Sequence, residues 1–134
     1  MSEKITADYV STLTEAIQTH AACKKNHGRM RDVLQTMSIE KVAQPTDWQF
    51  NYSGSVELRW HNGNEHLSSS TKSMTLTIFE SSYNISGDFS TDPNTYRSES
   101  RSNIQGLTDL DSAVQLLKIF VPLVLNFPSK GKRQ

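Results

Sequence analysis

The chain has 134 residues, and its 14 lysines and arginines balance its 14 aspartates and glutamates. This length fits one ordinary domain, which buries about two-thirds of the surface that its unfolded chain would expose. The balance of charge excludes a strong overall field that attracts DNA or an anionic membrane from a distance, so any nucleic-acid site has to be a local patch.

Two features bear on the cellular compartment. Cys23 is the only cysteine, which excludes an intramolecular disulfide and a cysteine-rich zinc site. The first ten residues, MSEKITADYV, lack the basic start and the apolar run of a secretory signal. We therefore expect a cytoplasmic protein.

The first 45 residues have the apolar spacing of helices. One stripe recurs at intervals of three and four residues: Val10, Leu13, Ile17 and Ala21. A second stripe has the same spacing: Met30, Val33, Leu34 and Met37. One straight helix would rotate the second stripe by roughly 140° from the first, so a break at residues 26–28 is favoured. The sequence predicts helices over 6–26, capped by Thr6, and over 29–42.

From Asp47 the apolar period changes from 3.6 to 2, which is the signature of β-strands. Six even positions carry large apolar residues: Trp48, Phe50, Tyr52, Val56, Leu58 and Trp60. Two arrangements keep all six on one side, namely one long strand bent at Gly54 and a hairpin with the loop 52–54. The hairpin pairs Phe50 with Val56.

This row of aromatic residues has two interpretations. The first is that the row packs in the core, because aromatic residues dominate core burial and recur at this period in any half-buried sheet. The alternative is an exposed platform on which nucleic-acid bases stack beside basic residues. Arg59 and His61 fall on the opposite face, which favours the core.

The next two apolar segments fit a second hairpin. A two-residue loop at 80–81 pairs Ile78 with Tyr83 and Leu76 with Ile85, which matches apolar residues with apolar residues. A polar segment then supplies a last strand that suits the edge of a sheet. We predict this last strand over residues 95–103.

The chain ends with an apolar helix. Thr108 is its expected cap, and the core stripe predicts a helix over 108–121. An apolar extension continues to residue 127, in which Pro122 either ends or kinks the helix. The basic tail 129–134 is expected to be disordered.

Together these elements predict an α+β fold. It consists of two N-terminal helices over 6–42, an antiparallel meander of four or five strands over 47–103, and a C-terminal helix packed on one face of the sheet. We expect a single domain over 1–128.

The C-terminal helix has more apolar surface than a small sheet can cover. The surplus predicts an interface with a protein partner or with a second copy of the chain, and full burial is the alternative. The candidate interface residues are Ile119, Phe120, Leu123, Val124, Leu125 and Phe127.

A basic run, KKNHGRMR, surrounds the predicted interhelical turn. Its four charged residues could bind nucleic acid or another anion: Lys24, Lys25, Arg29 and Arg31. The favoured interpretation is that they solvate the turn and complement the helix dipole.

Catalytic signals are weak. The histidines form no helical ligand pair, and neither a phosphate-binding loop nor a nucleophile elbow is present. His61 and His66 could meet a metal with Glu65, but without a further ligand we expect no metal site and no cofactor.

The preferred hypothesis is a non-enzymatic intracellular protein-binding module of the adaptor, chaperone, immunity or inhibitor type, as a monomer or a homodimer. The alternative is a nucleic-acid-binding protein that uses the turn 24–31 and the basic tail, with Lys130, Lys132 and Arg133. That alternative predicts an affinity that falls steeply with salt. A third hypothesis, an enzyme that uses the histidines, predicts bound metal. No membrane partner is expected.

Overall fold

The computed structural model describes residues 5–61, 73–87 and 102–125. It contains three α-helices, a short 3₁₀ helix and five strands in these residues. In chain order the elements are α1 (Ala7–Gln18), η1 (Lys24–Asn26), α2 (His27–Ile39), β1 (Asp47–Phe50), β2 (Val56–His61), β3 (Ser73–Ile78), β4 (Tyr83–Gly87), β5 (Ser102–Leu107) and α3 (Leu110–Leu125). None of the helices in this part of the chain is long and apolar enough to cross a membrane.

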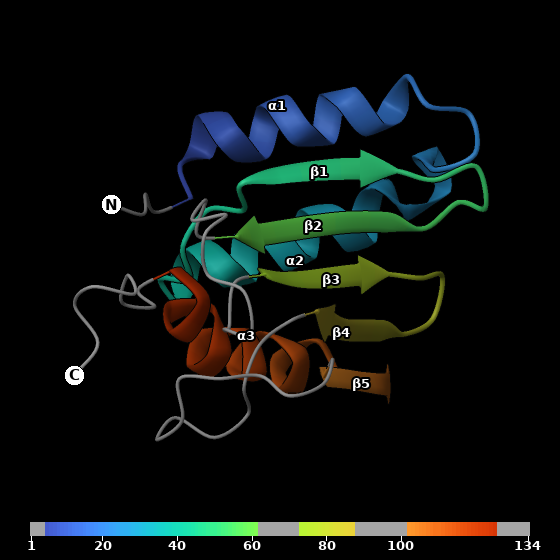
Figure 1. The fold of residues 1–134 in the computed structure, drawn as a ribbon. Coiled ribbons are helices and arrows are strands. Elements are labelled where there is room, and N and C mark those ends of the chain that lie inside the picture. Colours follow the sequence, from blue (N-terminus) through green and yellow to red (C-terminus); the bar gives the residue numbers. More distant parts are fainter. Residues whose placement is uncertain (1–4, 62–72, 88–101, 126–134) are drawn as a thin grey trace, which may run out of the picture.

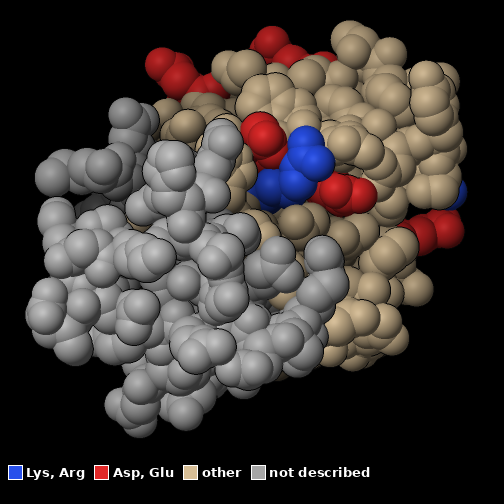
Figure 2. All heavy atoms as spheres, viewed as in Figure 1, with Lys and Arg blue, Asp and Glu red and all other residues tan. Residues whose placement is uncertain are grey.

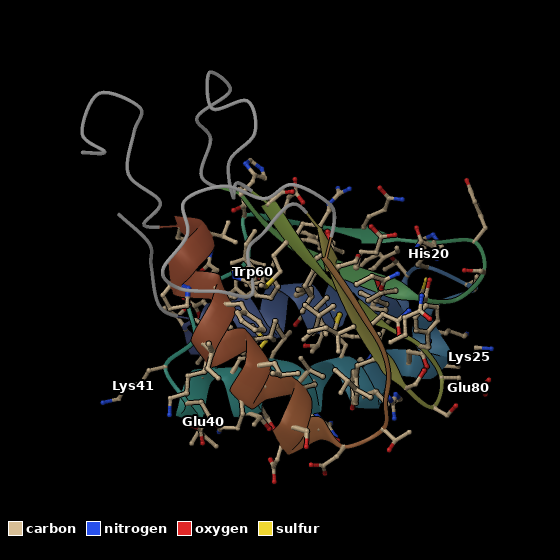
Figure 3. All side chains as sticks on the ribbon, turned by 60° about the horizontal axis from the view of Figure 1, so that its bottom comes forward. His20, Lys25, Glu40, Lys41, Trp60 and Glu80 are labelled. Carbon is tan, nitrogen blue, oxygen red and sulfur yellow. The ribbon has the colours of Figure 1, made fainter. Side chains whose placement is uncertain are left out.

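The strands form one antiparallel sheet with the order β1-β2-β3-β4-β5. The helices α2 and α3 cover one face of this sheet, and α1 packs beside α2 along the β1 edge (Figures 1 and 3). The predicted α+β fold, with two N-terminal helices, an antiparallel meander and a C-terminal helix on one face, is confirmed.

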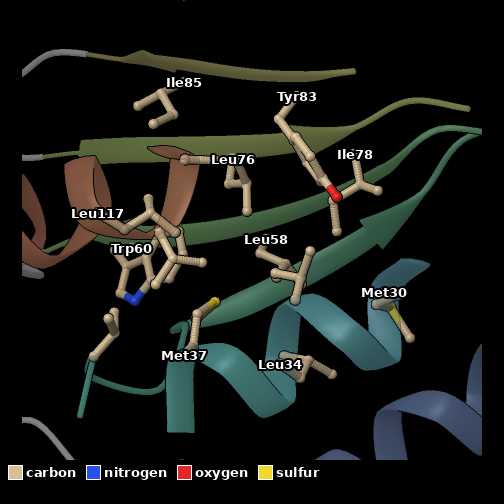
Figure 4. Close-up of a cluster of buried hydrophobic side chains, with 14 of the residues drawn as sticks. Met30, Leu34, Met37, Leu58, Trp60, Leu76, Ile78, Tyr83, Ile85 and Leu117 are labelled. Carbon is tan, nitrogen blue, oxygen red and sulfur yellow. The ribbon is translucent and has the colours of Figure 1, made fainter. Parts of the chain in front are cut away.

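The core lies between the sheet and these helices (Figure 4). Trp60 is its largest buried side chain, and its indole Nε1–H donates to the main-chain oxygen of Ala43 at 2.9 Å, so the buried donor is satisfied. The helices and strands contribute the fully buried residues in the predicted stripes: Leu13, Ile17, Met30, Val33, Leu34, Met37, Val56, Leu58, Leu76, Ile78, Ile85 and Leu117.

The first hairpin adopts the predicted three-residue loop. Trp48 pairs with Leu58 and Phe50 pairs with Val56. Gly54 has a φ of 101°, and a Cβ there would lie 3.0 Å from the main-chain oxygen of Ala22. A residue with a side chain would be strained at this position.

The second hairpin also has the predicted register, with Ile78 paired to Tyr83 and Leu76 paired to Ile85. The main-chain N–H of Phe79 donates to Ser82 at 2.9 Å, which closes the two-residue loop. Both hairpin loops and the α1–α2 turn lie at the same end of the molecule (Figure 1).

The break between the first two helices was predicted at the wrong place. The helix α1 ends at Gln18, and residues 26–28 do not separate the helices, because His27 and Gly28 open α2. Cys23, which follows α1, is buried and its thiol donates to the main-chain oxygen of Asn51 at 3.0 Å. Packing against the first hairpin therefore overrides helix propensity in this turn.

The end of α2 also differs from the predicted boundary at residue 42. Lys41 has a φ of 64°, and the N–H of Val42 donates to the oxygen of Met37 at 2.9 Å. This is a helix end formed around a left-handed residue, a position that glycine or asparagine usually occupies. The helix consequently stops at Ile39.

The last strand and the last helix extend later in the chain than predicted. The strand β5 spans Ser102–Leu107, so it continues past the predicted end at residue 103, and Ile104 and Leu107 pack against the core. Residues 95–101 of the predicted strand lie outside the described residues. Asp109 caps α3 in place of Thr108, since its carboxylate accepts from the N–H of Ser112 at 3.0 Å.

The helix α3 continues beyond the predicted end at residue 121, through Pro122 to Leu125. Pro122 is exposed, so the carbonyl that its missing N–H leaves unpaired can bond to water. The rest of the apolar extension and the basic tail 129–134 lie outside the described residues.

Candidate functional site

Part of the predicted interface on the C-terminal helix lies in the domain's own core. Phe120 and Val124 are buried and Leu125 is partly buried, because this side of α3 faces the sheet and α2. Phe120 and Val124 are therefore not accessible to a partner. The side chain of Leu123 and all of Phe127 lie outside the described residues.

Ile119 remains exposed, with 56 % of its side-chain surface accessible. The neighbouring Lys118 reaches across to α2, where its Nζ lies 3.0 Å from Oε1 of Glu40. Ile39, which precedes Glu40 in the chain, is 75 % exposed. Two exposed isoleucines are thus the chain neighbours of the two ionic partners that join α2 to α3.

The Glu40 carboxyl is ionised at neutral pH. Hydrogen bonds from Lys118 and Gln115, together with the positive charge of Lys118, hold the pKa of the Glu40 carboxyl below its ordinary value of 4.5. The pair links the C-terminal end of α2 to the middle of α3.

A groove between α1 and α2 adjoins Ile39. It has a volume of about 460 Å³, is open to solvent, and is lined by Ala7, Val10, Ser11, Gln35, Ser38 and Ile39. We call the groove together with Ile119 the helix-end surface. Half of its lining residues are apolar, and the serine and glutamine side chains among the others can donate and accept hydrogen bonds.

Sequence reasoning missed Ile39 and the groove. Ile39 falls outside the apolar stripe of its helix. This position in the sequence indicates that the side chain is exposed, but it does not indicate a binding site. The groove depends on how α1 and α2 lie against each other, and no spacing within either helix encodes that distance.

The predicted basic site is divided in the structure. The guanidinium of Arg29 donates to the main-chain oxygens of Phe79 at 2.8 Å and Ser82 at 3.4 Å, and it lies 4.5 Å from the ring centroid of Tyr83. Arg31 lies 3.9 Å from the carboxylate of Asp32. Arg29 is therefore engaged by groups of the chain itself, whereas the exposed ion pair of Arg31 is weak.

Lys24 and Lys25 are exposed in η1, beside the first hairpin. The Nζ of Lys25 lies 3.8 Å from the carboxylate of Glu80 in the second hairpin. Tyr52, in the loop of the first hairpin, is 94 % exposed, and its ring centroid lies 5.9 Å from that of His20. We call these five residues the hairpin-end surface.

The exposure of Tyr52 corrects the prediction that the whole aromatic row packs in the core. Val56, Leu58 and Trp60 are buried, and Trp48 remains 37 % exposed where its ring edge meets Tyr9. Tyr52 leaves the row because it belongs to the loop and not to either strand. The predicted loop 52–54 was the signal that could have identified it.

The opposite face of the sheet is polar. Nε of Arg59 donates to the carboxylate of Asp47 at 2.7 Å, and Glu57 accepts from the side-chain amide of Asn51 at 3.0 Å. Figure 2 shows a mixed cluster of basic and acidic groups near the centre of this side of the molecule and separate acidic groups along its upper edge, with no large described area of one sign.

The described residues contain no group of three or more histidine, cysteine, aspartate or glutamate side chains that could hold a metal. Glu65 and His66, two of the metal candidates, lie outside these residues. Burial raises the pKa of the Cys23 thiol, which disfavours a reactive thiolate.

Comparison with known proteins identifies no relative. No family model, curated protein sequence or solved structure matches the chain.

Proposed function

We propose that this domain is a non-enzymatic protein-binding module and that it engages its partner through the helix-end surface. The observation that carries the proposal is the 75 % exposure of Ile39 beside a groove of about 460 Å³. A single exposed isoleucine needs no explanation, but a contiguous apolar area next to a concavity is typical of interaction sites.

The lining of the groove favours a protein side chain over a small polar ligand. Ala7, Val10 and Ile39 contribute apolar surface, and the groove lining contains no charged side chain. Small-molecule sites are usually more enclosed and have convergent polar groups. An open groove between two helices suits an amphipathic helix, which binds by its apolar side chains at helical spacing.

The ion pair between α2 and α3 supports the same function. Ile39 and Ile119 are the chain neighbours of Glu40 and Lys118, so the ion pair places two exposed isoleucines on adjoining elements, where one partner could contact both. Apolar anchors surrounded by polar groups are the usual composition of a protein interface.

The test has to identify the partner and then measure its dependence on Ile39. A photo-crosslinking amino acid is placed at position 39 and, as a control, at the exposed Gln105 of β5. Crosslinked proteins are identified, and the purified partner is titrated against wild type, Ile39→Asp and Gln105→Asp by calorimetry. We expect at least tenfold weaker binding for Ile39→Asp and no change for Gln105→Asp.

Equal affinity of the partner for wild type and Ile39→Asp would overturn the proposal. Sedimentation of the purified chain shows whether the groove binds a different protein or a second copy of this chain. A dimer that Ile39→Asp dissociates identifies a second copy of this chain as the partner. The proposal includes the cytoplasmic location expected from the sequence, which cell fractionation checks.

A further inference from the structure

We propose that the hairpin-end surface is a second binding site, which takes single-stranded nucleic acid. A base stacks on the ring of Tyr52, and the adjoining phosphates contact Lys24 and Lys25. This surface and the helix-end surface lie at opposite ends of the molecule, as the positions of Lys25 and Lys41 in Figure 3 show.

Tyr52 is exposed on a loop that is held in place from behind. The N–H of Asn51 donates to Ser55 at 3.0 Å, and the N–H of Gly54 donates to Asn51 at 2.9 Å. The side chain of Asn26, which is buried, donates to the oxygen of Gly54 at 2.5 Å. The aromatic ring is therefore presented on a fixed backbone, which lowers the entropy lost when a ligand binds.

The ring of Tyr52 has one aromatic neighbour on its inner side. Its centroid lies 5.9 Å from that of His20, and His20 in turn lies 5.7 Å from Phe50. Nearly all of the surface of Tyr52 stays accessible. A nucleobase can use that surface, because every base has a flat apolar face and stacks on aromatic side chains with little regard to sequence.

The lysines lie where the backbone of a stacked nucleotide would pass. In Lys25, Cε lies 3.2 Å and Nζ 3.7 Å from the position that a Cβ would take at Gly54, two residues after Tyr52. Lys24 precedes it in η1 and is exposed. Figure 3 shows Lys25, His20 and Glu80 at the same end of the molecule.

Glu80 opposes the binding of an anion. Its carboxylate lies 3.8 Å from Nζ of Lys25, and both side chains are more than half exposed. An exposed pair of this kind is weak, so a phosphate can compete for Lys25. Removal of the Glu80 charge is expected to strengthen binding.

The small number of available lysine and arginine side chains favours a single strand over a duplex. Arg29 is hydrogen-bonded to carbonyls of the second hairpin, and Arg31 is not part of the hairpin-end surface, so Lys24 and Lys25 are the lysines and arginines of this surface. Two phosphate contacts are too few to hold a duplex, whose base faces are also hidden. For a single strand they predict a slope of about −1.4 in a plot of log affinity against log salt, or about sevenfold weakening between 50 and 200 mM.

The experiment measures the fluorescence anisotropy of labelled ten-nucleotide oligo(U) and oligo(dT) with the purified full chain. We expect saturable, weak binding with the salt slope given above. Tyr52→Ala should lose at least tenfold in affinity and Tyr52→Phe should keep it, because stacking needs the ring and not the hydroxyl. Glu80→Gln should bind several-fold more tightly.

A matched pair of variants isolates the position of the charge. Lys25→Ala and Lys41→Ala change the net charge equally, but only Lys25 lies at the hairpin end. Lys25→Ala should weaken binding and flatten the salt slope, whereas Lys41→Ala should do neither. Circular dichroism melts establish that each variant is folded. Tyr52 and Lys25 are both exposed, so the Tyr52 variant and the Lys25 variant each provide an independent test of the site.

Three results would overturn the proposal: no saturable binding at 20 mM salt, unchanged binding by Tyr52→Ala and Lys25→Ala, or equal binding of a ten-base-pair duplex. Ile39→Asp should bind the oligonucleotides as wild type does. The two proposals can therefore fail separately.

Discussion

Arg29 and Phe79 are 50 residues apart in the chain, yet Nε of Arg29 donates to the main-chain oxygen of Phe79 at 2.8 Å. This bond fixes the first turn of α2 to the second hairpin. One of the four basic residues that the sequence offered as an anion site is therefore part of the framework.

Replacement of Arg29 by alanine should destabilise the fold. The variant loses charged hydrogen bonds to two carbonyls and the contact with the Tyr83 ring, which together predict a loss of about 2 kcal/mol. Urea unfolding measures the loss. Arg31→Ala is the control, since its exposed ion pair with Asp32 predicts a change within about 0.5 kcal/mol. Equal stability of the two variants would contradict the framework role.

Lys41→Gly should stabilise the protein. Lys41 has a φ of 64°, a conformation that costs a residue with a Cβ about 1 kcal/mol and costs glycine little. The greater entropy of glycine in the unfolded chain offsets part of this gain in stability. The remaining gain should raise the midpoint of thermal unfolding. Lys41→Ala removes the same charge but keeps the Cβ, so it should bring no gain. A gain of the same size in Lys41→Ala would assign the effect to charge.

The Glu40–Lys118 ion pair should make stability sensitive to acid. The pKa of Glu40 is lower in the folded state than its ordinary value of 4.5. Its contribution is therefore fully present above that value and is lost as the pH falls through the lower folded pKa. Thermal melts between pH 7 and pH 3 should show a smaller loss for Glu40→Gln than for wild type. Parallel losses would show that the pair does not act in this range.

Tyr9→Phe should maintain or increase stability. The hydroxyl of Tyr9 is buried and has no hydrogen-bond partner in the described part of the chain, so its removal relieves a desolvation cost of about 1 kcal/mol. Denaturant titration at pH 7 measures the difference. A clear loss of stability would mean that the hydroxyl has a partner, such as a bound water.

The same tyrosine should limit stability at alkaline pH. Burial, reinforced by the negative charge of Asp47, raises the pKa of Tyr9 to about 12 from 10.0. Because the folded pKa lies above the unfolded one, folding favours the neutral phenol, and this contribution is present below pH 10 and lost as the pH rises toward 12. Tyr9→Phe removes the group, so it should lose less stability than wild type over that interval.

The strand pairing could be predicted because a shift of one residue in the register moves every side chain of the strand to the other face of the sheet. The pairs Trp48 with Leu58 and Ile78 with Tyr83 are the ones that keep apolar residues on one face. The end of α1 was not predictable in the same way. It depends on Cys23, whose thiol contacts Asn51, 28 residues away in the chain.

The candidate sites were only partly readable from the sequence. The apolar segment at the end of α3 indicates surplus hydrophobic surface, but it does not say that Phe120 is buried and Ile119 exposed. The basic run indicates four charges, but the carbonyls that engage Arg29 have no signature in the sequence. Composition shows which groups exist, and tertiary packing determines which of them stay accessible.

The strand order β1-β2-β3-β4-β5 places each strand beside its neighbour in the chain. During synthesis the hairpins can therefore form one after another as the chain leaves the ribosome, through contacts of short sequence separation. Leu117, which lies in the core, belongs to α3, which follows all five described strands in the chain. The helix α2 is made before the strands and can cover part of the apolar face early. The part that packs against α3, however, stays uncovered until α3 has emerged, and exposed apolar surface of this kind favours aggregation.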